Sequence, residues 1–112
     1  MKTDLVKVCG ITLDEDFGKL ASLGVDYAGI IFYPLSPRYA VGRLNSDKVK
    51  NIKSIQKVGV FVNAEIEDVY DKIEVFGLDY VQLHGEESPE YCAFIKKKAK
   101  VIKAFRLQSR LM

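Results

Sequence analysis

The sequence predicts an α/β fold in which helices cover a sheet of parallel strands. Short apolar and β-branched segments alternate along the chain with segments of helical periodicity. Residues 25–32 and other short segments are apolar on both faces, as strands buried inside a parallel sheet are. Strands that alternate with helices in this way form parallel sheets with right-handed crossovers.

The first half of the chain is expected to form strand 5–9, helix 13–24, strand 25–32 and helix 47–55. Both strands are rich in apolar and β-branched residues. The first helix carries acidic residues in its opening turn, where the helix dipole is positive, and Gly24 fits its stop. Pro34 and Pro37 keep residues 33–43 in a loop, and Ser46 is the expected N-cap of the second helix.

The second half is expected to form strand 57–62, helix 63–76, strand 79–83, a helix from residue 89 to the KKKAK segment at 96–100, and strand 101–105. Gly77 fits the end of the third helix. Ser88, followed by a proline at the first helical position, marks the start of the fourth. The lysines near the end of the fourth helix are interpreted as a solvated helix terminus, where cations complement the dipole.

The chain also contains a weak internal repeat. Residues 23–32 and 76–85 each place a helix stop before a strand that opens with Asp-Tyr, and Gly24 and Gly77 lie 53 positions apart. This spacing fits two strand–helix units and favours a barrel of like units. A closed (β/α)8 barrel needs at least about 200 residues. The predicted fold is therefore a partial (β/α)8 TIM barrel with five parallel strands and four helices, and the alternative is an open flavodoxin-like sheet.

Length and composition describe a single domain over residues 1–112, with 48% apolar and 29% charged residues. A net charge of +2 favours neither a nucleic acid nor a membrane as partner, and one histidine with two distant cysteines fits no metal site. The two cysteines are expected to be reduced thiols in a cytoplasmic protein. We expect the chain to be a truncated barrel or one completed by another polypeptide, including a homo-oligomer formed through its exposed edges.

Three residues at the carboxyl ends of predicted strands are candidates for chemistry, because function collects there in parallel α/β folds. Cys9 can act as a base or nucleophile if nearby positive charge favours its thiolate. Lys7, two residues earlier, lies on the same face of the strand and could supply that charge. The alternative is that Cys9 is a small buried hydrophobe. Arg38 either binds a carboxylate or phosphate or is a solvated loop residue. His84 is either a polar site residue or one satisfied by local backbone, and Cys92 is expected to be structural.

Five segments together resemble the phosphoribosylanthranilate isomerase family, the barrel enzymes of tryptophan biosynthesis. They are KVCGIT at 7–12, GIIFYPLSPRY at 29–39, VGVFVN at 58–63, VQLHGEESPEYC at 81–92 and VIKAFR at 101–106. The resemblance implies an aldose–ketose isomerase that needs no metal or organic cofactor. The small phosphorylated substrate, N-(5-phosphoribosyl)anthranilate, is rearranged to 1-(2-carboxyphenylamino)-1-deoxyribulose 5-phosphate.

The resemblance also implies roles for the three candidates. Cys9 would be the general base that removes the proton from the sugar C2, Arg38 would bind the anthranilate carboxylate, and His84 would line the substrate pocket. The family's general acid, an aspartate after the sixth strand, and its phosphate site after strands seven and eight have no counterpart in these 112 residues. We therefore expect impaired activity in this chain alone. The alternative is a non-catalytic half-barrel that assembles with itself or with a missing C-terminal half.

Overall fold

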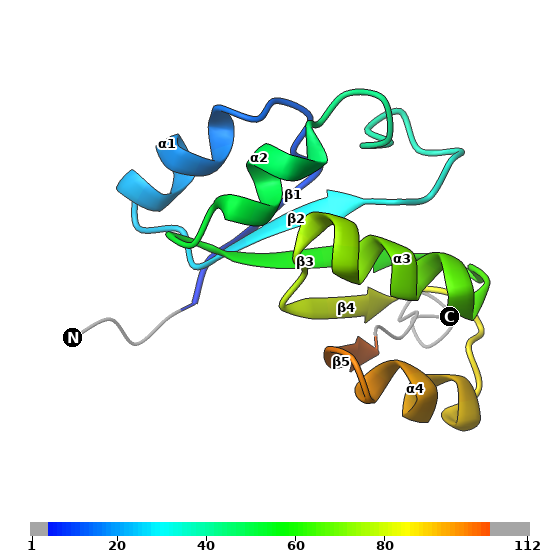
Figure 1. The fold of residues 1–112 in the computed structure, drawn as a ribbon. Helices are drawn as coiled ribbons and strands as arrows, with labels where there is room; N and C mark the ends of the chain where they lie inside the picture. The colour runs from blue at the N-terminus through cyan, green and yellow to red at the C-terminus, as the bar shows by residue number, and fades with distance from the viewer. Residues whose placement is uncertain (1–4, 104–112) are drawn as a thin grey trace, which may run out of the picture.

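The computed structural model describes residues 5–103, and within that range strands and helices alternate as expected (Figure 1). The elements are β1 (Lys7–Cys9), α1 (Asp16–Ser22), β2 (Tyr27–Ile31), α2 (Ser46–Asn51), β3 (Gln56–Phe61), α3 (Ile66–Phe76), β4 (Tyr80–Leu83), α4 (Pro89–Lys96) and β5 (Lys100–Lys103). No helix in the described range is long and apolar enough to cross a membrane.

The sheet has the strand order β1-β2-β3-β4-β5, and every neighbouring pair is parallel. Each helix therefore returns the chain to the next position in the same direction. Helix α2 packs against α3, and α3 packs against α4, along the outside of the sheet (Figure 1). A flavodoxin-like sheet has the order 2-1-3-4-5, so the open-sheet alternative is wrong and the partial barrel is confirmed.

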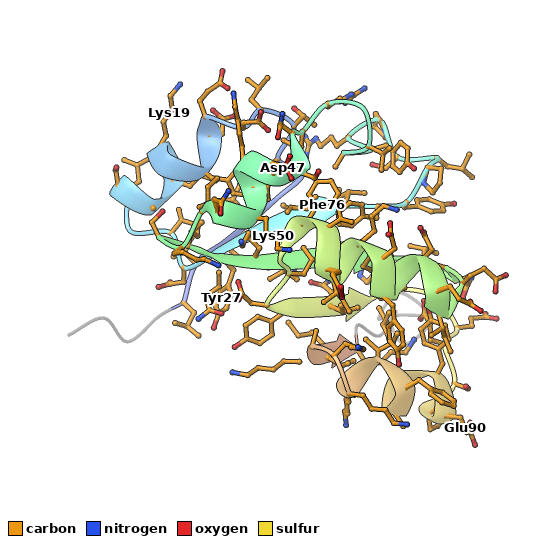
Figure 2. The ribbon with its side chains drawn as sticks, viewed as in Figure 1. Lys19, Tyr27, Asp47, Lys50, Phe76 and Glu90 are labelled. Carbon is orange, nitrogen blue, oxygen red and sulfur yellow. The ribbon has the colours of Figure 1, made fainter. Side chains whose placement is uncertain are left out.

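Alternate strand residues separate into a helix-covered face and an open face. The core lies on the covered face, where Ala28, Ile30 and Val81 pack with Phe17 and Val69 of the helices. Figure 2 shows Tyr27 projecting from the opposite side of the sheet, while Lys19 and Glu90 extend away from their helices. The register therefore places the residues level with Cys9 and Tyr27 on the open face.

The sheet curls toward this open face. Lys7 Nζ on β1 donates a hydrogen bond to Gln82 Oε1 on β4, although two strands lie between them. In a flat sheet these strands would be about 14 Å apart, beyond the combined reach of the two side chains. The open face is therefore concave, and we call it the concave face.

The Asp-Tyr repeat of the sequence has a structural counterpart. Asp26 donates its N–H to Val6 O at 2.9 Å and accepts Val6 N–H on Oδ2 at 2.8 Å. Asp79 makes the same pair of bonds with Lys57, at 2.9 Å each. The tyrosines that follow the two aspartates meet edge to face, with ring centroids 5.5 Å apart. Each aspartate thus ties the start of its strand to the preceding strand in the sheet.

Helix α2 differs most from expectation. Its N-cap is Asn45, whose Oδ1 accepts Lys48 N–H at 3.1 Å, so the prediction of Ser46 is wrong by one residue. The helix also ends at Asn51 instead of residue 55. Lys57, buried from β3, donates its ammonium to the carbonyl of Val49 at 3.0 Å and so satisfies part of the helix end.

The other predicted ends lie close to the observed ones. Gly77 adopts φ 66 after α3, and Ser88 Oγ accepts Tyr91 N–H at 3.1 Å at the start of α4, as expected. Strand β5 begins at Lys100, and the end of the strand predicted over 101–105 falls outside the described residues.

Candidate active site

The three predicted site residues lie along one edge of the sheet, because parallel strands end on the same side. Cys9 is the last residue of β1, Arg38 lies in the loop after β2, and His84 directly follows β4. This is the edge at which barrel proteins of this kind carry their chemistry.

The Cys9 thiol is exposed, so its interpretation as a small buried hydrophobe is wrong. Its register partner on β2 is Gly29, and a methyl group built at that position would lie only 2.6 Å from Cys9 Sγ. The carbonyl of Gly29 accepts the N–H of Gly10 at 2.9 Å and that of Ile11 at 3.2 Å. Glycine at position 29 therefore gives the thiol room, and its carbonyl holds the chain that leaves β1.

The Arg38 side chain lies across Gly10, the residue after the thiol. Gly10 has φ +85, and a Cβ built there would be 2.4 Å from Arg38 Cδ and 3.1 Å from Nη1. The loop is held by Arg43 Nη1, which donates to Pro37 O at 2.7 Å, and by Arg38 N–H, which donates to Ser36 Oγ at 3.1 Å. The loop thus places the Arg38 guanidinium against the residue that follows Cys9.

Lys7 lies on the same face as Cys9, as the alternation predicted. Its ammonium is hydrogen-bonded to Gln82, a residue that sequence reasoning did not select. The only early signal for Gln82 was its position two residues before His84, which puts both on one face of a strand. Cys92 is half-buried and packs against the core, in agreement with its structural interpretation.

His84 is exposed at the end of β4. Its backbone N–H donates to the backbone carbonyl of Phe61 at 2.9 Å, which continues the hydrogen bonding between β3 and β4 by one residue. His84 follows β4, which lies three strands from β1 in the sheet order, so it stands well apart from Cys9 at the end of β1. The structure therefore places Arg38 against the residue that follows Cys9, and places His84 farther along the same edge.

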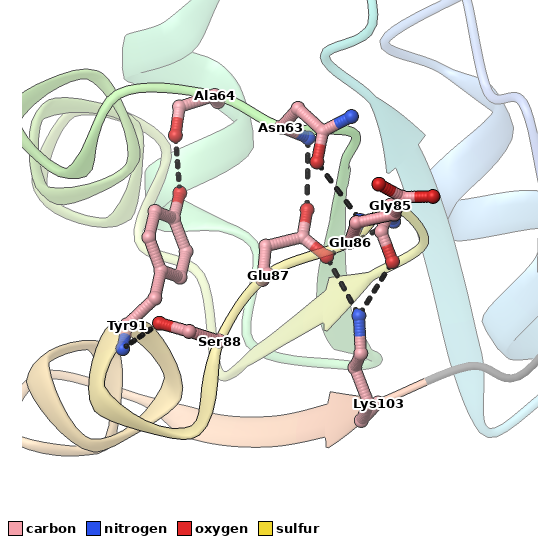
Figure 3. A network of polar contacts seen from close by, with 8 residues as sticks. All are labelled: Asn63, Ala64, Gly85, Glu86, Glu87, Ser88, Tyr91 and Lys103. Atoms are coloured by element: carbon pink, nitrogen blue, oxygen red, sulfur yellow. Dashed lines mark hydrogen bonds and ion pairs between the residues drawn. The ribbon is translucent and has the colours of Figure 1, made fainter.

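The segment after His84 is organised by Glu87, which was not predicted as a site residue (Figure 3). Its side chain is only 1% exposed and its carboxylate accepts three hydrogen bonds. The donors are Asn63 N–H at 2.8 Å, Gly85 N–H at 3.0 Å and Lys103 Nζ at 2.8 Å. Lys103 Nζ also donates to Gly85 O at 2.6 Å. Glu87 therefore joins the carboxyl ends of β3, β4 and β5.

The electrostatics of Glu87 follow from these contacts. Burial acts to raise the pKa of the Glu87 carboxyl, but the hydrogen bonds from Lys103 and from backbone N–H groups outweigh it and lower that pKa. The carboxylate is therefore the stable form. Among residues 5–103, no group of three or more histidine, cysteine or acidic side chains is arranged to hold a metal ion.

Comparisons with known proteins all point to one family. Residues 6–111 match the sequence model of the family described as N-(5'-phosphoribosyl)anthranilate isomerase. The chain is 42% identical to the isomerase of that name from Citrifermentans bemidjiense, covering 92% of this chain and 50% of that protein. It is 37% identical to the one from Parabacteroides distasonis, covering 95% and 49%. The chain thus spans about half the length of the curated relatives it matches.

Solved structures agree. A monomeric form of the dimeric isomerase from Thermotoga maritima superposes with a TM-score of 0.79 at 38% identity, over 96% of this chain and 56% of that one. The Thermus thermophilus isomerase gives a TM-score of 0.80 at 34% identity, over 94% and 53%. A third, with a TM-score of 0.77 at 38% identity over 88% and 52%, is a complex with reduced 1-(o-carboxyphenylamino)-1-deoxyribulose 5-phosphate.

Proposed function

The chain belongs to the phosphoribosylanthranilate isomerase family, and we propose that it supplies the proton-abstracting and carboxylate-binding part of that isomerase's active site. The reaction is the rearrangement of N-(5-phosphoribosyl)anthranilate to 1-(2-carboxyphenylamino)-1-deoxyribulose 5-phosphate in tryptophan biosynthesis. The observation that carries the proposal is the Arg38 side chain lying across Gly10, the residue that directly follows the exposed Cys9.

Cys9 acts as the general base once the sugar ring has opened to a Schiff base. The thiolate takes the proton from C2, and the C–H electrons form the C1–C2 double bond of an enolamine while the iminium nitrogen becomes neutral. The enolamine then tautomerises to the ketone. A thiolate, not a thiol, performs this step. The exposed position of Cys9 on the concave face supports access of the substrate.

Arg38 binds the anthranilate carboxylate. A guanidinium presents parallel N–H donors that match the two oxygens of a carboxylate, a geometry that an ammonium lacks. Because Arg38 lies against the residue after Cys9, a carboxylate held there orients the sugar carbon toward the thiolate. His84 contributes a polar ring to the substrate pocket at the same edge.

A chimera provides the test, since the family resemblance assigns the acid and the phosphate site to later strands. Residues 6–103 of this chain replace the matching half of the Citrifermentans bemidjiense isomerase, and turnover is followed by the change in anthranilate fluorescence. Arg38→Met is expected to raise KM for the substrate by about 10- to 100-fold, the loss of a charge-assisted pair, with a smaller change in kcat. Lys48→Met, which removes a cation from the exposed part of α2, is the matched control. A chimera that folds but shows no turnover, or equal KM values for Arg38→Met and the parent, would contradict the proposal.

We also propose that the protein works in the cytoplasm and that copies of the chain associate through the outer edges of β1 and β5. Those two strands end the sheet order, so each has one edge without a neighbouring strand of the described sheet. Sedimentation of the 112-residue chain is expected to show a dimer, and a monomer at all concentrations would contradict the association.

A further inference from the structure

Both peptide groups that flank His84 are held in place. On one side, its own N–H is bonded to Phe61 O at 2.9 Å. On the other, Gly85 is held at both of its backbone polar atoms: its N–H donates to Glu87 Oε1 at 3.0 Å, and its carbonyl accepts Lys103 Nζ at 2.6 Å. The His84 side chain is consequently attached to a backbone that has little freedom to rotate.

We propose that Glu87, through its buried ion pair with Lys103, is a positioning residue that holds the His84 ring at the substrate edge, given the binding role proposed above for His84. The residues Glu87, Lys103, Asn63 and Gly85 are called the strand-end network below. Its polar atoms come from the ends of three strands and from the loop before α4 (Figure 3).

The chemistry of the network requires a carboxylate at position 87. Its two oxygens accept three donors, two of them backbone N–H groups from opposite sides, at 2.8 and 3.0 Å. A glutamine has the same shape but one oxygen, so its amide NH2 would face a backbone N–H. The Lys103 ammonium would also lose its only described anionic partner. A buried donor left without an acceptor is costly, and the loop is expected to rearrange.

The residue types at positions 63 and 85 of the strand-end network are also constrained. Asn63 adopts φ 50, a left-handed conformation that asparagine tolerates better than most residues. Its Oδ1 accepts Glu86 N–H at 2.9 Å and would lie 2.5 Å from a Cβ built on Gly85. The residue after His84 must therefore be a glycine for Asn63 to close over the loop.

The test uses the fact that the chain contains one histidine, so its ring gives a single set of 1H–13C resonances in the 112-residue protein. Glu87→Gln is compared with Glu86→Gln, which removes the same charge from an exposed neighbouring side chain. Asn63→Gly is a milder variant, because glycine keeps the positive φ without strain and loses only the Oδ1 acceptor. Amide hydrogen exchange of Gly85 is measured in parallel.

In Glu87→Gln we expect the His84 ring resonances to shift and broaden. Amide exchange of Gly85 should accelerate by about 10- to 100-fold, the factor that corresponds to the free energy of one hydrogen bond to a charged group. Asn63→Gly should shift the same resonances, and Glu86→Gln should leave them unchanged. Unaltered ring resonances in folded Glu87→Gln, or an equal shift in Glu86→Gln, would overturn the positioning role. If Glu87→Gln does not fold, unaltered ring resonances in Asn63→Gly overturn it.

The chimera separates this proposal from the function it rests on. Glu87→Gln is expected to raise KM by the same factor as His84→Asn, with Glu86→Gln at the parent value. If His84→Asn leaves KM unchanged, the binding role of His84 fails, while the ring resonances still decide whether Glu87 positions it. If His84→Asn raises KM and Glu87→Gln does not, the positioning role fails and the proposed function stands.

Discussion

Replacing Gly29 by alanine is expected to displace the Cys9 thiol with little other change. The new methyl group would stand 2.6 Å from Cys9 Sγ and 3.0 Å from Cys9 Cα, where ordinary contact begins near 3.4 Å. The sulfur must therefore move by about 1 Å, since the β1 backbone is tied to β2 by the sheet register. Gly29 does not have a positive φ, so backbone strain does not contribute.

Two magnitudes follow from this displacement. Overpacking of this kind costs about 1–3 kcal/mol of unfolding free energy. A misplacement of about 1 Å in a reacting group lowers the rate by roughly 100-fold. The loss should fall on kcat, because Gly29 lies against the thiol whereas Arg38, the proposed carboxylate-binding residue, lies across Gly10. Gly18→Ala is the matched control: Gly18 lies inside α1, and apart from its chain neighbours and the backbone of its own helix, no atom of the described residues lies within 4 Å of a Cβ built there. That variant should gain up to about 1 kcal/mol.

Urea denaturation of the 112-residue chain and steady-state kinetics of the chimera measure the two effects. The reasoning would be refuted if Gly29→Ala kept the stability of the parent, or if the chimera carrying it kept its kcat. It would also be refuted if Gly18→Ala showed the same losses, because the effect would then come from alanine itself and not from the thiol.

Three further predictions concern stability. Burial lowers the pKa of Lys57, with smaller effects from neighbouring charges, so the unfolded chain binds the proton more tightly than the folded one. The unfolding free energy of the parent, measured relative to Lys57→Met, should therefore rise with pH toward 10.5 and level off above it. A difference between the two proteins that stays constant with pH in urea titrations would contradict this. Burial raises the pKa of Tyr91 to about 12 from 10.0. The stability that Tyr91 contributes is therefore fully present below pH 10 and is lost between pH 10 and 12, and Tyr91→Phe should not show this loss. An equal decrease in unfolding free energy above pH 10 in both proteins would argue against it. Gly10→Ala combines a positive φ with a contact of 2.4 Å between the new Cβ and Arg38 Cδ, and it should lower the unfolding free energy by more than about 1 kcal/mol. A thermal unfolding midpoint equal to that of the parent would contradict this.

The order of elements was predictable from local patterns, because each parallel strand is a short apolar run and each helix carries its own stop or cap. Ser88 and Gly77 act through neighbours in the sequence, and both behaved as predicted. The end of α2 was not predictable in this way. It depends on Lys57, a lysine of β3 that is buried against the helix, and lysine in a strand gives no sequence signal of burial.

The candidate site divides in the same manner. Cys9, Arg38 and His84 could be selected because each stands at a strand end or in a proline-bounded loop. Glu87 and Lys103 lie sixteen positions apart, as in many unremarkable charge pairs, and only the parallel pairing of β4 with β5 brings them to 2.8 Å. The contact of Arg38 with Gly10 likewise arises from the loop's return across the sheet edge.

Deuterium at the sugar C2 tests the central claim most directly. In the chimera, substrate labelled at C2 should lose its deuterium to solvent during turnover, and Cys9→Ala should slow that loss by about 10²–10⁴-fold, the contribution of a general base. Cys92→Ala, at the other cysteine, should keep the parent rate. If Cys9→Ala releases deuterium as fast as the parent, then the proton-abstracting group lies elsewhere and this half of the barrel does not supply the base.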